Sequence, residues 1–176
     1  MKTVNRKCKF VILALLAATA ASGQKPVPKP AEEPPVTRFR AELVAARENP
    51  AAIEFSVDTF RLELAYRKVV EKAKSDFDMS EATDALAHGY DSLMNKYYRK
   101  LAAVLQGSDK QTLVAAQKAW LAFRDAEGKL SRTVSQSEYS GGGTMQGLVE
   151  SQEYLLLVRS RTTALFDHYA RATQSY

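Results

Sequence analysis

The sequence contains a single cysteine, Cys8, among its 176 residues. Cys8 precedes the apolar run 10–18, whereas a lipid-anchor cysteine must directly follow such a run at the cleavage point. We therefore exclude a lipid anchor at Cys8. The rest of the sequence has no thiol, so it can form no internal disulfide and offers no thiolate nucleophile or thiolate metal ligand.

The motifs of common catalytic sites are also missing. The two histidines, His88 and His168, belong to no pair at metal-ligand spacing, so no metal site is predicted. There is no GxSxG motif, and the three glycines at 141–143 are not followed by the Lys-Ser/Thr of a phosphate-binding loop. Asp125 and Glu127 stand two positions apart on a predicted helix, so their side chains diverge. We therefore expect neither an enzyme nor a cofactor.

Residues 1–23 have the order of a secretory signal peptide. Four cationic residues and no acid precede the apolar run 10–18, and small residues follow it up to Gly23. A membrane span needs about 20 apolar residues, and this run is shorter. We expect cleavage after Ala20 or Gly23, no stable membrane anchor, and a periplasmic or secreted protein.

Loss of the signal peptide changes the charge of the protein. The full sequence has a formal net charge of +5, and the four cations of residues 1–23 account for all but +1 of it. A nearly neutral domain lacks the basic surface that nucleic-acid binding requires. We therefore exclude nucleic acid as a partner.

Five of the six prolines lie in residues 24–37. Such a composition is typical of an extended linker without packed structure. We predict a disordered linker over residues 24–37, followed by a single helical domain over residues 38–176. About 150 residues remain after the signal peptide, which is enough for one domain with its own core.

Apolar residues recur at helical spacing from residue 38 onward. Ser80 is a candidate N-cap for the clearest helix, Gly107 a candidate end, and Ser108 opens a capping box for the next helix. The pattern predicts an all-α fold, an antiparallel bundle of three to four long helices without disulfides. The predicted helices are 38–48 (ended by Asn49-Pro50), 57–76, 81–105, one from 108 that weakens near Gly128, and 144–172, with a polar loop over 131–143.

Arginines on two predicted helices, Arg124 on one and Arg159 and Arg161 on the other, favour a polar link between helices. An arginine side chain can bind a carboxylate on a neighbouring helix through its planar fork of donors. We predict a polar clamp of this kind, with Asp91 and Asn95 of the preceding long helix as plausible partners.

The aromatic residues at helical spacing suggest a core. Trp120 and Phe123 stand at core positions of one helix, so we predict that both are packed inside. Tyr90, Tyr97 and Tyr98 lie within nine positions. They form either a buried face with hydroxyls at its rim or an aromatic patch that binds another protein.

Four segments share a pattern with a known family. Residues 91–98, DSLMNKYY, are similar to a D-x-x-L-N-x-x-Y helix, and residues 113–127, LVAAQKAWLAFRDAE, to an L-x-x-A-Q-x-A-W-L-x-F-R-D-A-E segment. Residues 139–145, YSGGGTM, and the Arg-Thr pair at 161–162 fit the family's glycine loop and closing helix. Over residues 78–170 the sequence therefore resembles the LprI-like lysozyme-inhibitor family of exported bacterial proteins. The motif residues, with structural roles expected, are Asp91, Asn95, Tyr98, Gln117, Trp120, Phe123, Arg124, Asp125, Glu127 and Arg161.

The cysteines that this resemblance implies are absent. Family members usually carry a cysteine directly after F-R-D-A-E, paired with one in the last helix, and often another near the start of the domain. Here Gly128 occupies the first position, Glu153 lies at or near the second, and residues 78–90 contain no cysteine. Packing alone must then hold the last helix, without the about 2–4 kcal/mol that a disulfide typically contributes.

The resemblance implies a non-catalytic protein that binds and inhibits lysozyme-type muramidases. Such an inhibitor must occlude a sugar-binding cleft whose working groups are two carboxylates. We expect the glycine-rich loop to enter the cleft, with its tyrosine as an anchor and Arg132 or Lys129 near the carboxylates. The candidate partner-binding residues are Tyr139, Ser140, Gly141, Gly142, Gly143 and Thr144.

Two further hypotheses remain open from the sequence. The protein could be a structural or adaptor module that binds another envelope protein through an exposed tyrosine or leucine face, which would form a contiguous apolar patch. A hydrolase acting on cell wall would need convergent titratable groups, and the sequence offers no such set. Animal lysozymes are cationic, so a partner with a net charge of +1 gains little electrostatic steering toward them.

Overall fold

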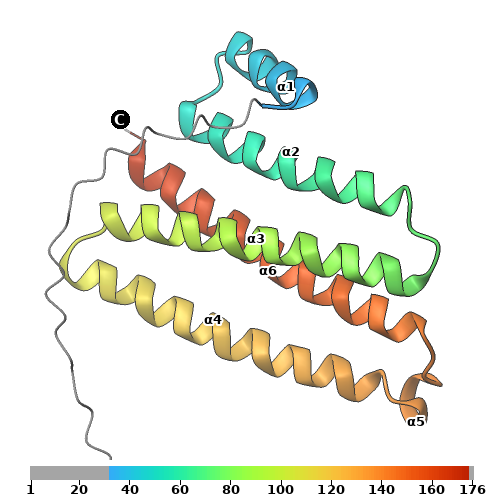
Figure 1. Ribbon diagram of the computed structural model, residues 1–176. Helices are drawn as coiled ribbons and strands as arrows, with labels where there is room; N and C mark the ends of the chain where they lie inside the picture. The colour runs from blue at the N-terminus through green and yellow to red at the C-terminus, as the bar shows by residue number, and fades with distance from the viewer. Residues whose placement is uncertain (1–31, 175–176) are drawn as a thin grey trace, which may run out of the picture. The chain divides into compact units, whose positions relative to one another are not determined.

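The computed structural model describes residues 32–174, and the predictions for residues 1–31 lie outside this range. All regular structure in the described range is helical (Figure 1). The prediction of an all-α bundle with three to four long helices is confirmed, because four of the helices are long. The helices are α1 (Pro34–Ala45), α2 (Pro50–Val70), α3 (Asp76–Val104), α4 (Gly107–Val134), α5 (Ser137–Ser140) and α6 (Met145–Thr173).

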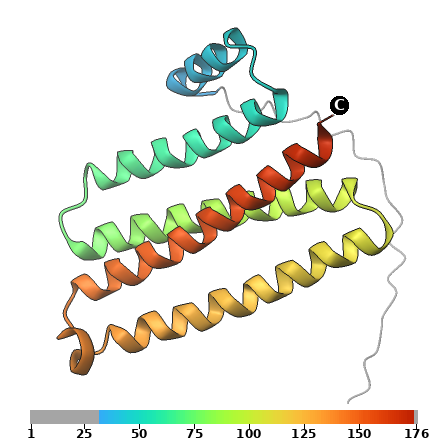
Figure 2. The same cartoon turned by 180° about the vertical axis from the view of Figure 1, so that it is seen from behind.

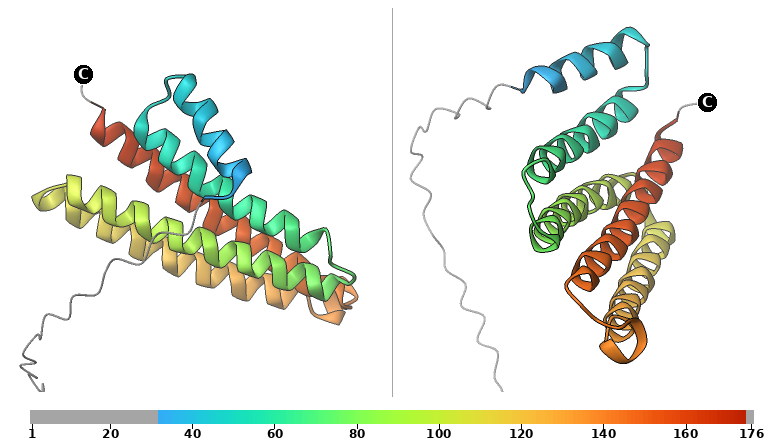
Figure 3. Two further views of the ribbon diagram at one scale, coloured as in Figure 1. Left: turned by 45° about the horizontal axis from the view of Figure 1, so that its top comes forward. Right: turned by 90° about the vertical axis from the view of Figure 1, so that its right-hand side faces the viewer.

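The pair formed by α3 and α6 is the centre of the bundle. These two helices have the most extensive mutual contact, and Figure 2 shows them crossing along most of their length. Helix α2 packs on α3, with α1 resting on α2, while α4 packs on α6. Figure 3 shows α2 and α4 separated by the central pair. None of the helices in residues 32–174 combines the length and the apolar character needed to cross a membrane.

The core follows the apolar pattern of α3. Its buried positions recur three or four residues apart, which places them on one helix face. They pack against buried aliphatic residues of α6, with Tyr90 and Tyr97 inside the core and Tyr98 packed at its edge. The tyrosines therefore form a buried face, and not an aromatic patch for a partner. The buried residues of the two clusters are Leu86, Ala87, Tyr90, Leu93, Met94, Tyr97, Leu101, Leu113, Leu155, Val158 and Leu165.

Helix α2 begins seven residues earlier than predicted. The prediction that Asn49-Pro50 ends α1 is wrong, because α1 already ends at Ala45 and the backbone turns at Arg47, whose φ is 58°. The pair instead starts α2, because the Asn49 side chain accepts a hydrogen bond from the backbone N–H of Ala51 (2.8 Å). Proline is well suited to the first helical position, where its missing N–H is not needed. The same effect starts α1 at Pro34, so the prediction of a linker reaching residue 37 is wrong over 34–37.

The predicted N-cap of α3 is also wrong. Ser75 caps the helix, its side chain accepting a hydrogen bond from the backbone N–H of Asp78 (3.1 Å). Ser80 lies inside the helix and shares a hydrogen bond with Ser151 of α6 (2.8 Å between the hydroxyl oxygens). This contact joins the second turns of α3 and α6.

Helix α4 differs from its prediction at both ends. It begins at Gly107, whose φ of 51° permits the sharp reversal after α3, and Ser108 makes no capping bond. The helix passes through Gly128 without interruption and ends at Val134, so the predicted weakening and the loop from residue 131 are wrong. A glycine inside a helix costs only about 1 kcal/mol, which is too little to break a helix of 28 residues.

The attachment of α1 to α2 should weaken in acid. Glu32 accepts hydrogen bonds from Arg40 of α1 and Arg61 of α2. The bond from Arg40, assisted by Arg61 and opposed by partial desolvation, lowers the pKa of Glu32 from 4.5 to about 2. Because the folded-state pKa is lowered, this contribution is complete above pH 4.5 and is lost as the pH falls through about 2.

This prediction can be read from an NMR titration of the Glu32 carboxyl carbon. The expected midpoint lies near pH 2, and the stacked pair Phe39 and Phe60, whose ring centroids are 4.5 Å apart, reports on the attachment of α1. The variant Glu32→Gln should make the α1 signals independent of pH in this range. A Glu32 midpoint near 4.5 would contradict the ion pair.

Candidate functional site

The predicted polar clamp between Arg124, Asp91 and Asn95 is not what the structure shows. Arg124 donates two hydrogen bonds to the carboxylate of its neighbour Asp125 (2.7 and 3.0 Å). Asn95 donates to the carbonyl oxygen and the carboxylate of Asp91 on its own helix (2.9 and 3.1 Å). These contacts are local because each partner lies within one turn of the same helix.

A link between helices does exist, through Gln117 and Arg161. The Nε of Arg161 in α6 donates to the amide oxygen of Gln117 in α4 (3.0 Å), and the Gln117 amide nitrogen contacts the sulfur of Met94 in α3 (3.7 Å). Desolvation lowers the pKa of Arg161. The guanidinium groups of Arg161 and Arg124 lie 6.0 and 5.5 Å from the ring centre of Trp120, within the range of a cation–π contact. These motif residues therefore hold α4 onto α6.

Helix α4 is only shallowly packed. Of its residues Leu113 alone is buried, and Trp120 is half-buried. Phe123 is 50% exposed, so the prediction that it packs in the core is wrong. Leu130 and Val134 continue the same face toward the end of the helix and are also exposed. The apolar face of α4 thus extends beyond the surface that α6 covers.

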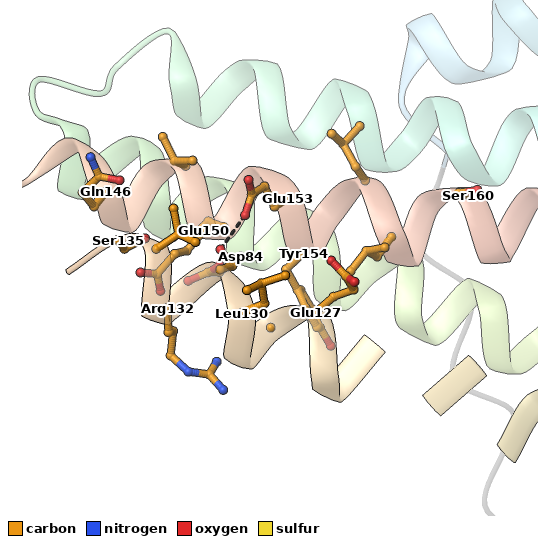
Figure 4. Close-up of a pocket in the computed structure, with 17 residues that line it drawn as sticks. Asp84, Glu127, Leu130, Arg132, Ser135, Gln146, Glu150, Glu153, Tyr154 and Ser160 are labelled. Carbon is orange, nitrogen blue, oxygen red and sulfur yellow. Dashed lines mark hydrogen bonds between the residues drawn. The ribbon is translucent and has the colours of Figure 1, made fainter. Parts of the chain in front are cut away.

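A groove of 620 Å³ lies between the second half of α4 and the first half of α6 (Figure 4). Its lining is mainly apolar, with Leu130 and Val134 from α4 and Val149, Leu156 and Leu157 from α6. The polar lining residues include Asp84, Glu127, Arg132, Glu150, Glu153 and Tyr154. Glu127 is thus the one residue of the family-like motif that borders the groove.

No sequence pattern predicted this groove. Leu130 and Leu156 stand at helical spacing with other apolar residues of their helices, yet the structure leaves them 55% and 61% exposed. The sequence did contain a hint of the groove, because α4 and α6 each carry more apolar residues than one packed helix face requires. Only the angle between α4 and α6 determines which of these residues remain uncovered.

The glycine-rich loop lies at one end of the groove. Val134 and Ser135 line the groove just before α5, and Gln146 lines it just after the loop. In Figure 1 α5 and the loop connect the end of α4 to the start of α6. The loop and the groove therefore make one continuous surface.

The loop itself is exposed. Tyr139 and Ser140 are the last two residues of α5, so the predicted loop is non-helical only over residues 141–144. Tyr139 is 67% exposed, and Ser140, Gly141, Gly143 and Thr144 are exposed as well. A Cβ built on Gly141 or Gly143 would meet no atom within 4 Å. The loop therefore stands clear of the bundle and is not packed against it.

The backbone of the loop requires glycine. Gly141, Gly142 and Gly143 have φ values of 80°, 67° and 103°, in the region that residues with a Cβ rarely adopt. Gly142 also approaches Ser137, where an added Cβ would lie 3.3 Å from the serine Cβ. The hydroxyl of Thr144 donates to the carboxylate of Asp76 (3.4 Å), which ties the end of the loop to α3.

Residues 32–174 contain no group of three or more His, Cys, Asp or Glu side chains arranged to hold a metal ion. What the described surface offers is an exposed loop beside an apolar groove. Such a combination can contact another macromolecule over a continuous area.

Comparison with known proteins identifies the family. The family model described as "Lysozyme inhibitor LprI" matches residues 68–165, more than half of the sequence. The chain belongs to the LprI family. The match runs from the last residues of α2 through most of α6, so it includes both the loop and the groove, whereas α1 lies outside it.

This LprI family member also has a bacterial relative. It is 29% identical over 107 residues to the "Uncharacterized protein R02472" of Rhizobium meliloti (strain 1021), covering 53% of this chain and 73% of the relative. No solved structure matches the chain.

The groove of this LprI family member lies where the resemblance implies a disulfide. Gly128 and Glu153, which stand at or near the positions of the family's paired cysteines, both line the groove. A hydrogen bond replaces the covalent link here, because the hydroxyl of Ser131 in α4 donates to the carboxylate of Glu153 in α6. The two helices are therefore joined at this end by a weaker contact than a disulfide.

Proposed function

We propose that this LprI family member is an exported, non-catalytic inhibitor of lysozyme-type muramidases. The family description supports the class of partner. The observation that carries the proposal is the exposed glycine loop, residues 139–144, which stands clear of the bundle beside an open groove. Predicted export places such an inhibitor where it meets enzymes that degrade the cell wall.

The loop has the properties needed to block a sugar-binding cleft. Glycine backbone carries no side chain, so Gly141 and Gly143 can approach the walls of a narrow cleft closely. The exposed ring of Tyr139 supplies a large contact area at low cost in conformational entropy. We propose that Tyr139 occupies a position where a sugar ring would otherwise bind, with the loop filling the space beside it.

Arg132 is the cation that we assign to the carboxylates of the enzyme. It lies on α4 shortly before the loop, is exposed, and forms no ion pair with a described residue. Arginine can bind a carboxylate through two parallel hydrogen bonds. Lys129 is three positions further from the loop along α4 and is the second candidate for this role.

We propose the following layout for the exported protein. Residues 1–23 would be the signal peptide and residues 24–33 the linker, and the helical domain would begin with α1 at Pro34. This revises the predicted end of the linker and keeps one domain.

A cell-wall lysis assay tests the proposal. Residues 24–176, mixed with lysozyme and a suspension of bacterial cell walls, should slow the clearing of the suspension at micromolar concentration. Heat-denatured protein serves as the control for non-specific effects. Undiminished lysis at micromolar protein would exclude inhibition of that enzyme.

The adaptor function has one observation in its favour, which is the exposed apolar lining of the groove. A protein that binds another envelope component through this face should bind that component without slowing lysis. Pull-down from an envelope extract, performed beside the lysis assay, therefore separates the two functions.

A further inference from the structure

The charged residues that line the groove between α4 and α6 are mostly acidic, although the protein as a whole is nearly neutral. Four of its lining residues are acidic, Asp84, Glu127, Glu150 and Glu153, and Arg132 is the one lining base. Figure 4 shows the Arg132 guanidinium pointing away from the α6 carboxylates. The predicted exported protein has a net charge of +1, so the negative charge of the groove is local.

These carboxylates differ from the other acids that lie between helices. On the α2 side, Glu54 and Asp58 pair with Lys96, and Glu63 pairs with Arg159. In contrast, none of the four groove carboxylates forms an ion pair with any residue in the described range. The α2 acids are neutralised within the fold, whereas the groove acids are left for an outside cation.

The apolar lining adds a second requirement for the occupant. Leu130 and Leu156, from opposite sides of the groove, remain more than half exposed. Burying apolar surface is favourable, so a partner that covers these side chains gains affinity. The chemistry of the groove thus fits a segment with cationic side chains and an apolar base, in which long Lys or Arg stems can also cover leucine.

We propose that this groove binds a cationic surface segment of the muramidase, next to the cleft that the 139–144 loop enters. This rests on the proposed function and names the second half of its interface. A second copy of the chain fits less well, because two acidic grooves repel each other. Local charge also supplies the electrostatic steering toward a cationic enzyme that a net charge of +1 does not.

A variant that lacks two of the groove carboxylates tests the proposal, beside a control variant that lacks two carboxylates elsewhere. Glu127→Gln with Glu150→Gln removes one carboxylate from each side while keeping side-chain size. The matched control is Glu48→Gln with Glu71→Gln, which removes two exposed carboxylates outside the groove. Binding of hen lysozyme by each exported protein is measured at 20 mM and 200 mM salt, and thermal unfolding confirms that each variant is folded.

We expect the groove variant to bind lysozyme about tenfold more weakly than wild type at low salt, because close charge pairs at interfaces contribute strongly there. The salt dependence of its affinity should be reduced, and the control variant should match wild type. Lysozyme with succinylated lysines should lose affinity for the wild-type protein, a readout that needs no substitution.

The outcomes separate the two proposals. If wild type binds lysozyme and the groove variant binds equally well with the same salt dependence, the groove proposal is overturned and inhibition through the loop stands. If wild type binds no lysozyme, both proposals are overturned. Equal loss of affinity in the groove and control variants would show general charge steering and would also overturn the groove as the site.

Discussion

Replacing Tyr97 with alanine should lower the free energy of unfolding by about 3–5 kcal/mol, as for other large aromatic residues in cores. Tyr97 is completely buried on α3. Its ring packs edge-on against Phe55 of α2 and Phe166 of α6, both with centroids at 5.3 Å, and lies 6.0 Å from Tyr169. The truncation therefore opens a cavity where three helices meet. Urea denaturation followed by far-ultraviolet circular dichroism measures the loss.

The phenylalanine variant should behave in the opposite way. The Tyr97 hydroxyl is buried and has no hydrogen-bond partner within the described residues, and burial raises its pKa. Tyr97→Phe removes this unsatisfied group and keeps the ring, so the free energy of unfolding should stay unchanged or rise by up to about 1 kcal/mol. A loss as large as that of the alanine variant would show that the hydroxyl, and not the ring, stabilises the core.

The second large effect is expected on inhibition. Replacing Tyr139 with alanine should weaken inhibition about 30-fold, which corresponds to the roughly 2 kcal/mol of an aromatic hot spot at an interface. Stability should not change, because the ring is 67% exposed and contributes nothing to the buried clusters. The inhibition constant from the lysis assay and the unfolding midpoint provide the two readouts.

A matched control separates the tyrosine from exposed apolar residues in general. Val44 is 58% exposed on α1, which lies outside the family match, so Val44→Ala should inhibit like wild type. Wild-type inhibition by both variants would remove Tyr139 from the interface while leaving the inhibitor function itself in place. In that case the groove and Arg132 would be the next surfaces to test.

The periodicity of α3 shows how far sequence can go in a helical protein. Its apolar positions follow a three-four spacing, and those from Ala82 to Leu101 are buried, whereas Val104 at the end of the helix is exposed. In the middle of a core helix the apolar face is packed against its neighbours, so the spacing alone predicts which residues are buried. The last helix was predicted within one residue at either end for the same reason.

Helix ends were less predictable, since several residues can compete for one capping role. Ser75 and Ser80 are both reasonable N-caps, and only the path of the preceding chain decides between them. Asn49-Pro50 is ambiguous in a different way, because a pair that can stop one helix is also well suited to start another, and here it only starts α2. The linker prediction is wrong at Pro34 because proline suits the first position of a helix as well as an extended linker.

The candidate site was likewise predicted only in part. The turn at residues 141–143 was predicted from its glycines, because three consecutive residues without a Cβ can adopt positive φ together, whereas its exposure was not. The partners of Arg124 and Arg161 were not, since side-chain hydrogen bonds depend on the rotation of each helix about its axis. That rotation decides whether an arginine faces a carboxylate on the neighbouring helix or bonds the residue next to it in the sequence.

The all-α class, the long helices, the glycine turn at 141–143 and the family follow from the sequence, because each rests on local spacing or on a motif. The groove between α4 and α6 was decided only by tertiary structure. Whether Leu130 and Leu156 are covered, and whether Glu127 and Glu150 remain unpaired, depends on the distance and angle between two helices. Those quantities arise from packing of the whole bundle, and no local pattern of residues encodes them.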